Sequence, residues 1–256
     1  MTYIFKLSFF ILLFLACSFW PTSLLANDLF SDGLRLSTSI GGSQSLPNSL
    51  TIHREDQPDY HIHAFYTNKP FDDSQYWSGR LEYWKNKSSF EIELIHHKIY
   101  LQNYPQGLTD FSISDGYNLL YLNKAWALPK NQLAFRTGLG VVIAHPDITF
   151  SDRARYIVKG IDGLRLAGVS GQVAFEQRYN LSEYHYLKYE LKFTASYAKT
   201  AISGNLNEYV IAPDFAFHAT FGIGSHPIQK TSIKTVALYT VPGFLTFVSG
   251  KLFDLK

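Results

Sequence analysis

The chain has 256 residues, of which 46% are hydrophobic, 16% are aromatic and only 17% are charged. So little charge, with a mean hydropathy of -0.06, excludes an intrinsically disordered chain. The formal net charge of +2 lacks the strong basic excess of a nucleic-acid-binding protein, so we expect no nucleic-acid partner.

The first 26 residues have the pattern of a secretory signal peptide. Lys6 supplies a positive charge, residues 7–20 are almost wholly apolar, and Pro21 interrupts the run before the small residue Ala26. An uncleaved transmembrane anchor is the alternative, but the run is short for a membrane span. The only cysteine, Cys17, lies inside this segment, which leaves lipidation there as a further alternative. A cysteine-free remainder is typical of a bacterial envelope protein rather than a small secreted eukaryotic domain.

Apolar and polar residues alternate with a period of two in segments spread over residues 27–225. In the segment 186–199, Leu187 and Tyr189 share one face of an extended chain, and Lys188 and Glu190 share the other. No helical period is sustained after residue 33. Alternating segments of roughly ten residues, separated by turn residues, are the signal of a transmembrane β-barrel.

A soluble β-sandwich alternates in the same way, so the charged face has to decide between the two folds. In this sequence the charged face always opposes the aromatic face, and its charges nearly cancel. The inward charged residues are Arg80, Glu82, Glu91, Glu93, Arg136, Glu176, Arg178, Lys188, Glu190 and Lys192. We predict that they form an ion-pair network in the lumen of a narrow barrel, because lipid surrounds the outside.

The connections between the alternating segments are short and long in turn. The short ones are residues 86–88, 127–131 and 180–183, and the long ones are 103–115, 144–163 and 200–211. Short periplasmic turns with longer external loops are the outer-membrane pattern. The alternation of short and long connections therefore favours a barrel, as the charged face does.

We predict an all-β fold, a closed antiparallel up-and-down transmembrane β-barrel of eight to ten strands, with ten slightly favoured. Seven strands come from residues 77–225, and residues 60–68 supply the eighth. Gly33–Gly41 and Ser49–Arg54 could add one more pair. Residues 226–256 are predicted to form a C-terminal extension or an extra hairpin.

The signal peptide, the alternating strands and the segment RTGLGVVIAHPDITF resemble the small outer-membrane β-barrel superfamily of bacteria. That group includes opacity-type, OmpA-like and lipid A-modifying barrels, and the likeness covers about residues 30 to 225. The resemblance implies the outer membrane of a Gram-negative cell, insertion by the barrel-assembly machinery, and contact with outer-membrane lipids and lipopolysaccharide. It implies no particular activity, since members include adhesins, structural proteins and enzymes.

The predicted strand directions bring a serine, histidines and carboxylates to the outer rim. The residues concerned are His96, His97, Ser112, Ser114, Asp115, His145, Asp147 and Asp152. A lipid hydrolase needs a histidine to take a serine proton and a carboxylate to orient the imidazole. His97, Ser114, Asp115 and His145 are the catalytic candidates, although ordinary rim residues are the favoured explanation.

Two further patterns are expected to be structural. His61 and His63 share one face, but no third ligand follows at a metal-binding spacing. Glu91 and Glu93 can be neutralised by bases on neighbouring strands. We therefore expect no metal and no cofactor.

The favoured function is that of a non-enzymatic outer-membrane protein that stabilises the envelope or binds partners through its extracellular loops. Its filled lumen is expected to prevent steady conductance. A lipid- or lipid A-modifying hydrolase is the alternative, and a narrow channel for small solutes is a third. Arg153, Arg155 and Lys159 in the 144–163 loop could contact lipopolysaccharide phosphates. We expect a monomer.

Overall fold

The computed structural model describes residues 28–227, apart from 56, 70–74, 114–115, 130–131, 145, 154–164 and 203–206. Within these residues every regular element is a β-strand, and no helix is long and apolar enough to cross a membrane. The predicted signal peptide and all but the first two residues of the 226–256 extension lie outside the described part.

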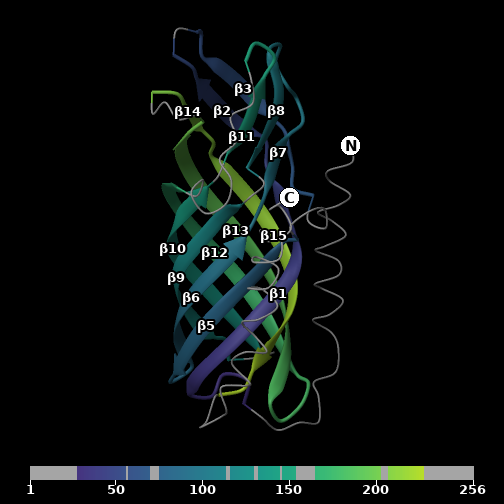
Figure 1. Ribbon diagram of the computed structural model, residues 1–256. Coiled ribbons are helices and arrows are strands. Elements are labelled where there is room, and N and C mark those ends of the chain that lie inside the picture. The colour runs from purple at the N-terminus through teal and green to yellow at the C-terminus, as the bar shows by residue number, and fades with distance from the viewer. Residues whose placement is uncertain are drawn as a thin grey trace, which may run out of the picture.

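Eight long antiparallel strands close into a barrel (Figure 1). They are β1 (Gly33–Ser45), β5 (Trp77–Lys85), β6 (Ser88–His96), β9 (Tyr117–Ala127), β10 (Leu133–Ala144), β12 (Arg165–Asn180), β13 (His185–Ala201) and β15 (Asp214–Ser225). Around the barrel the order is β12, β10, β9, β6, β5, β1, β15, β13, and pairing of β12 with β13 closes the ring. The predicted closed antiparallel barrel is confirmed.

The period of two in the sequence becomes two different surfaces of the barrel wall. Outward side chains at mid-height are strongly exposed, such as Leu139 at 79% and Leu122 at 71%. Inward side chains on neighbouring positions, such as Arg136, are fully buried. An exterior of large apolar side chains around a polar interior is the arrangement that a lipid environment stabilises.

The observed strand number lies within the predicted range of eight to ten, but two details need correction. The barrel has eight strands, so the preference for ten was wrong, and its first strand is β1 rather than residues 60–68. Residues Ser49–Arg54 and 60–68 instead fall largely in short strands outside the ring. The five-residue β3 (Tyr60–Ala64) is too short to cross a bilayer, which takes roughly 9–11 residues, whereas β1 has 13.

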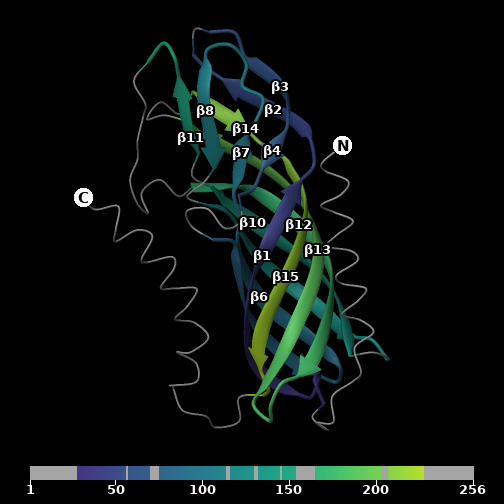
Figure 2. The same ribbon diagram turned by 90° about the vertical axis from the view of Figure 1, so that its right-hand side faces the viewer.

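Seven short strands lie outside the ring. They stand above one end of the barrel, which we call the loop end (Figures 1 and 2). β14 (Tyr209–Ile211), β2 (Asn48–His53) and β3 continue the sheet from β13. A separate four-stranded sheet has the order β11 (Asp147–Phe150), β8 (Leu108–Ile113), β7 (Ile99–Leu101), β4 (Tyr66–Thr67). We call these seven strands the external sheets.

A buried apolar cluster joins the external sheets to the barrel. Leu50 and Phe111 from the external strands belong to the same cluster as Leu119 and Val142 from barrel strands, and all four are fully buried. The described parts of the long connections that contribute to this cluster therefore pack as a cap on the barrel. Alternation alone could not predict this, because it does not show which strands meet.

The opposite end, which we call the turn end, carries the tight connections between β5 and β6, β9 and β10, and β12 and β13. Asn86 and Lys87 have positive φ angles of 50° and 62°, as expected at a two-residue hairpin turn. Phe30 packs on Trp84 with a ring separation of 4.9 Å. The segment before β1 thus contributes apolar side chains to the interior at this end.

Candidate functional site

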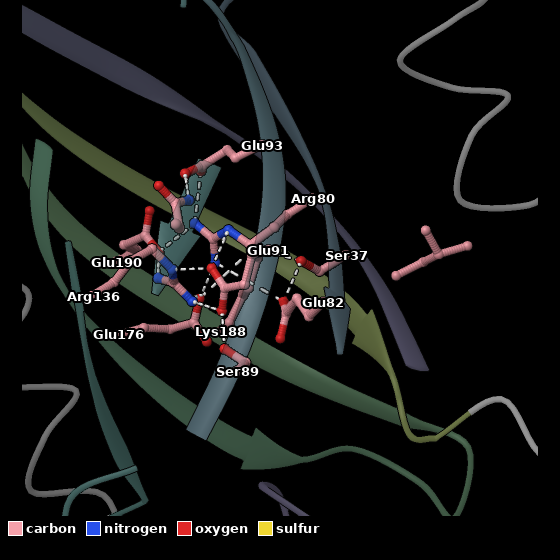
Figure 3. Close-up of polar contacts among 12 residues, drawn as sticks. Ser37, Arg80, Glu82, Ser89, Glu91, Glu93, Arg136, Glu176, Lys188 and Glu190 are labelled. Atoms are coloured by element: carbon pink, nitrogen blue, oxygen red, sulfur yellow. Dashed lines mark hydrogen bonds and ion pairs between the residues drawn. The ribbon is translucent and has the colours of Figure 1, made fainter. Parts of the chain in front are cut away.

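The barrel interior at mid-height is occupied by the ten charged residues named from the sequence, which are all buried. Arg80 of β5 lies at the centre of this ion-pair network (Figure 3). Its Nη1 lies 2.6 Å from Oε2 of Glu176, and its Nη2 lies 2.7 Å from Oε1 of Glu93 and 2.6 Å from Oε2 of Glu190. One guanidinium therefore bonds three carboxylates.

The partners of Arg80 lie both beside β5 and across the lumen from it. Glu93 is its register partner on the adjacent β6, whereas Glu176 lies on the opposite wall. β12, which carries Glu176, is four strands away from β5 in a ring of eight. A second contact crosses the lumen in the other direction, because Nη2 of Arg178 in β12 lies 2.6 Å from Oε2 of Glu82 in β5. The network thus combines pairs that cross the lumen with pairs along its wall, such as Arg80–Glu93 and Arg178–Glu176.

The remaining bases complete the network. Arg136 bonds Glu91, with Nε 2.5 Å from Oε2, and it also pairs with Glu190. Nζ of Lys192 lies 2.6 Å from Oε1 of Glu93 and 3.0 Å from Oε1 of Glu190. Nζ of Lys188 donates to Oγ of Ser37 at 2.9 Å and lies 3.8 Å from Glu176.

The balance of charge explains how so many ions can be buried together. Burying a charge is expensive unless it is paired and hydrogen-bonded. Here five acidic side chains pair with five basic ones. Neutral side chains donate hydrogen bonds to a carboxylate oxygen that the bases do not reach. Gln172 and Asn123 both donate to Oε2 of Glu93, at 2.8 Å and 3.0 Å.

A second polar set lies nearer the loop end, around His97. His97 directly follows β6 and its ring is fully buried. Its Nε2 lies 2.9 Å from Oδ2 of Asp214, the first residue of β15, and its Nδ1 lies 2.8 Å from Oγ of Ser43 in β1. The structure therefore brings one of the predicted catalytic candidates together with a serine and a carboxylate that the sequence reasoning did not select.

The structure does not describe the other three predicted catalytic candidates. Ser114, Asp115 and His145 lie outside the described residues. Ring Nδ1 of His96 lies 2.8 Å from Oδ1 of Asn118, in a separate contact from that of His97.

Two rim candidates, Ser112 and Asp147, belong to the external sheets, and a third, Asp152, lies in the turn that follows β11. Ser112 and Asp147 are register partners where β8 pairs with β11. Arg54 donates to Asp152 over 2.8 Å, and this hydrogen bond lowers the pKa of Asp152. The predicted Ser/His/carboxylate set thus included residues that fold into a different layer from His97.

His61 and His63 share one face of a described strand. Both lie on β3, where Nδ1 of His61 is 3.3 Å from Oγ1 of Thr51, and the His63 ring meets Phe65 edge to face. In the part of the chain that the structure describes, no group of three or more potential ligands comes together.

Ser43 and Asp214 carried weak signals in the sequence. Ser43 continues the inward positions of β1 after Ser37 and Ser39, and Asp214 begins the inward series of β15. The alternation of inward and outward side chains along these strands is sufficient to place both residues in the lumen. Only the pairing of β1 with β15, which aligns Ser43 with His218, places Ser43 beside His97.

A shallow groove at the loop end carries positive charge on the barrel rim. Arg165, Leu166, Lys199 and Tyr209 contribute to its lining. Nζ of Lys199 lies 3.8 Å from the centre of the Tyr209 ring. Arg153, one of three bases for which either a phosphate contact or a solvated face is predicted, bonds Glu208 at 2.7 Å. Arg155 and Lys159 lie outside the described residues.

No protein-family model matches the chain, and no curated protein matches it. Several solved structures are similar. Neisserial surface protein A is 9% identical with a TM-score of 0.39, over 75% of this chain and 96% of that one. The outer membrane protein OprG of Pseudomonas aeruginosa is 14% identical with a TM-score of 0.40, over 76% and 96%. The attachment invasion locus protein of Yersinia pestis is 10% identical with a TM-score of 0.38, over 76% and 99%. The likeness is one of fold alone.

Proposed function

We propose that this chain is a non-conducting barrel of a Gram-negative outer membrane, exported by its signal peptide, which stabilises the envelope and binds surface partners through its external sheets. This role needs no enzymatic step. The single observation that carries the proposal is the ion-pair network, in which Arg80 and Arg178 bond carboxylates on the opposite wall.

Buried side chains fill the lumen at three levels along the barrel axis, which supports this role. The network fills the middle of the lumen, and buried Leu29 and Phe30 pack with Trp84 at the turn end. At the loop end the apolar cluster runs from barrel residues such as Leu119 into the external sheets. A continuous water path would have to break contacts at each height, so transport of solutes is disfavoured.

We expect the refolded full-length chain to show no steady conductance in planar bilayers. The physical reason is that opening the lumen would separate buried ion pairs such as Arg80–Glu176. Insertion is checked on the same preparation by the difference in gel migration between boiled and unboiled samples. Large stable channels from inserted protein would contradict the proposal and favour the narrow-channel alternative.

Lipopolysaccharide is the partner that we propose for the rim groove. Arg165 and Lys199 place two cations beside the aromatic ring of Tyr209. Guanidinium and ammonium groups suit phosphate oxygens, and an aromatic face beside them suits a sugar ring. The long connections lie at this end, which we place outside the cell.

Exchange of both cations for glutamine, in the double variant R165Q/K199Q, is expected to weaken lipopolysaccharide binding several-fold. Binding is measured with fluorescent lipopolysaccharide and detergent-solubilised protein. Lys124→Gln is the matched control, because Lys124 is an outward lysine beside Ser88 near the turn end. Equal affinity of the double variant and the wild type would show that the groove is not the phosphate site.

A further inference from the structure

The contacts of His97 determine which of its nitrogen atoms carries the proton. An ionised carboxylate only accepts hydrogen bonds, so the Nε2 that faces Asp214 is the protonated nitrogen. Nδ1 is then an acceptor, and the hydroxyl of Ser43 must donate to it. In this tautomer the imidazole is ready to take the serine proton, and the carboxylate stabilises the imidazolium that results.

A neighbouring histidine does not compete for that proton. The His218 ring lies 5.3 Å from the ring of His97, edge to face. Its Nδ1 pairs with the hydroxyl of Tyr76 at 3.0 Å, and its Nε2 pairs with Oγ1 of Thr194 at 2.9 Å. Both nitrogens of His218 are therefore engaged by other residues, and His97 is the base next to Ser43.

The wall beside Ser43 is built differently from the rest of the barrel. β1 pairs with β15 as far as Ser45, but its pairing with β5 ends at Ile40, opposite Trp77. Among the described residues, no strand pairs with the last part of β1 on that side. Ser43 is half-buried, whereas His97 and Asp214 are fully buried. The serine thus lies where the set is most accessible.

The same edge of β1, which no described strand pairs with, supplies a donor for a developing negative charge. The N–H of Leu46 donates to the carbonyl of Phe215 on β15, and the N–H of Ser45 donates to Asn68 on the other side. Because successive N–H groups of a strand alternate in direction, the N–H of Ser43 points to the same side as that of Ser45. It is placed to bond an oxyanion formed at Ser43.

We infer that Ser43, His97 and Asp214 form a hydrolytic site for carboxylic esters of membrane amphiphiles, an activity beyond the structural role proposed above. Ser43 is the nucleophile, His97 is the general base and acid, and Asp214 is a positioning residue. This assignment differs from the predicted set of His97 with Ser114, Asp115 and His145, since only His97 is common to both.

The reaction proceeds in two balanced halves. Oγ of Ser43 bonds to the ester carbonyl carbon while its proton passes to Nδ1 of His97. The ester C–O bond then breaks, the leaving alcohol takes the proton from His97, and an acyl-serine remains. A water molecule attacks this acyl group and gives a proton to His97, which returns it to Ser43 as the carboxylic acid leaves. Ester and water become acid and alcohol, and Asp214 keeps its charge throughout.

The surroundings favour an ester that carries an acyl chain. Outside the wall near Ser43, Ile40 is 56% exposed and Phe217 is 38% exposed. These side chains face the hydrocarbon of the bilayer, so an acyl chain could lie along them while its ester group reaches the edge of β1 beside Ser43. A soluble short-chain ester lacks this contact and should react more slowly.

The test uses the refolded full-length chain in detergent micelles, a long-chain fluorophosphonate that bonds covalently to nucleophilic serines, and p-nitrophenyl esters of four- and twelve-carbon acids. We expect the wild type to be labelled once and to hydrolyse the twelve-carbon ester faster. Ser43→Ala should abolish labelling and lower hydrolysis by roughly a thousand-fold or more. A folded wild type that is not labelled would overturn the inference, as would equal labelling of the Ser43→Ala variant.

Ser39→Ala is the matched control, because Ser39 is a buried inward serine on the same strand whose Oγ makes no hydrogen bond within the described residues. It should keep wild-type labelling and rate.

Asp214→Asn should lower kcat by roughly 10³–10⁴-fold with KM unchanged, because a wrong tautomer of His97 impairs chemistry and not binding. A loss confined to KM or to folding would indicate that Asp214 is only structural. Conductance is measured separately, so failure of this inference leaves the non-conducting role standing.

Discussion

Replacement of Arg80 by methionine is expected to lower the free energy of unfolding of the barrel by about 3–5 kcal/mol. The guanidinium bonds Glu93, Glu176 and Glu190, which lie on three different strands. Without it, three buried carboxylates lose a shared partner while Arg136 and Lys192 compensate only in part. Urea unfolding in detergent micelles or vesicles, followed by tryptophan fluorescence, measures the change.

Arg35→Met is the matched control for this prediction. Arg35 is an equally buried inward arginine, but it has no ion pair within the described residues. Its Nη2 donates only to the carbonyl and the hydroxyl of Ser31. We expect a much smaller loss, because no carboxylate is left unpaired. Equal losses for the two variants would show that the network contributes no more than the burial of any arginine.

Replacement of Leu139 by arginine is expected to destabilise the membrane-inserted barrel by about 2–4 kcal/mol, the range for a cation near the bilayer midplane. Leu139 is 79% exposed and pairs with Leu122 near the middle of β10 and β9. The cost arises because an outward charge at this height meets hydrocarbon. Unfolding in lipid vesicles measures it.

The control for this second prediction is Leu128→Arg. Leu128 is an exposed leucine in the tight connection between β9 and β10, where a charged head group can reach water. A loss of less than about 1 kcal/mol is expected there. If Leu139→Arg proved as mild as this control, the exterior of the barrel would not face hydrocarbon and the membrane assignment would fail.

The faces of the strands could be predicted because they depend on neighbouring positions in one strand. Leu187, Tyr189 and Leu191 point outward, and Lys188 and Glu190 point inward, as the period of two requires. The turns at residues 86–87 and 181–184 and the end on which they lie followed from length and composition. A local signal is sufficient for features that local geometry determines.

The pairing of charges could not be predicted, because like charges lie side by side along the wall. Glu82 is the register partner of Glu91, and Glu176 is the register partner of Glu190. Glu82 is bonded across the lumen by Arg178, and Glu176 is bonded across the lumen by Arg80 as well as by Arg178 on its own strand. Which acid meets which base therefore depends on closure and register, which bring together residues distant in the chain.

By itself the sequence determined the all-β class, the alternating faces of the long strands, the inward position of the charges and the alternation of short with long connections. Only the tertiary structure decided that β1 completes a ring of eight, that residues 48–64 pair in a cap, and that Ser43 and Asp214 meet His97. The physical reason is that side-chain direction is set by the period of a single strand, whereas the choice of partner is set by hydrogen bonds between strands that are far apart in the chain.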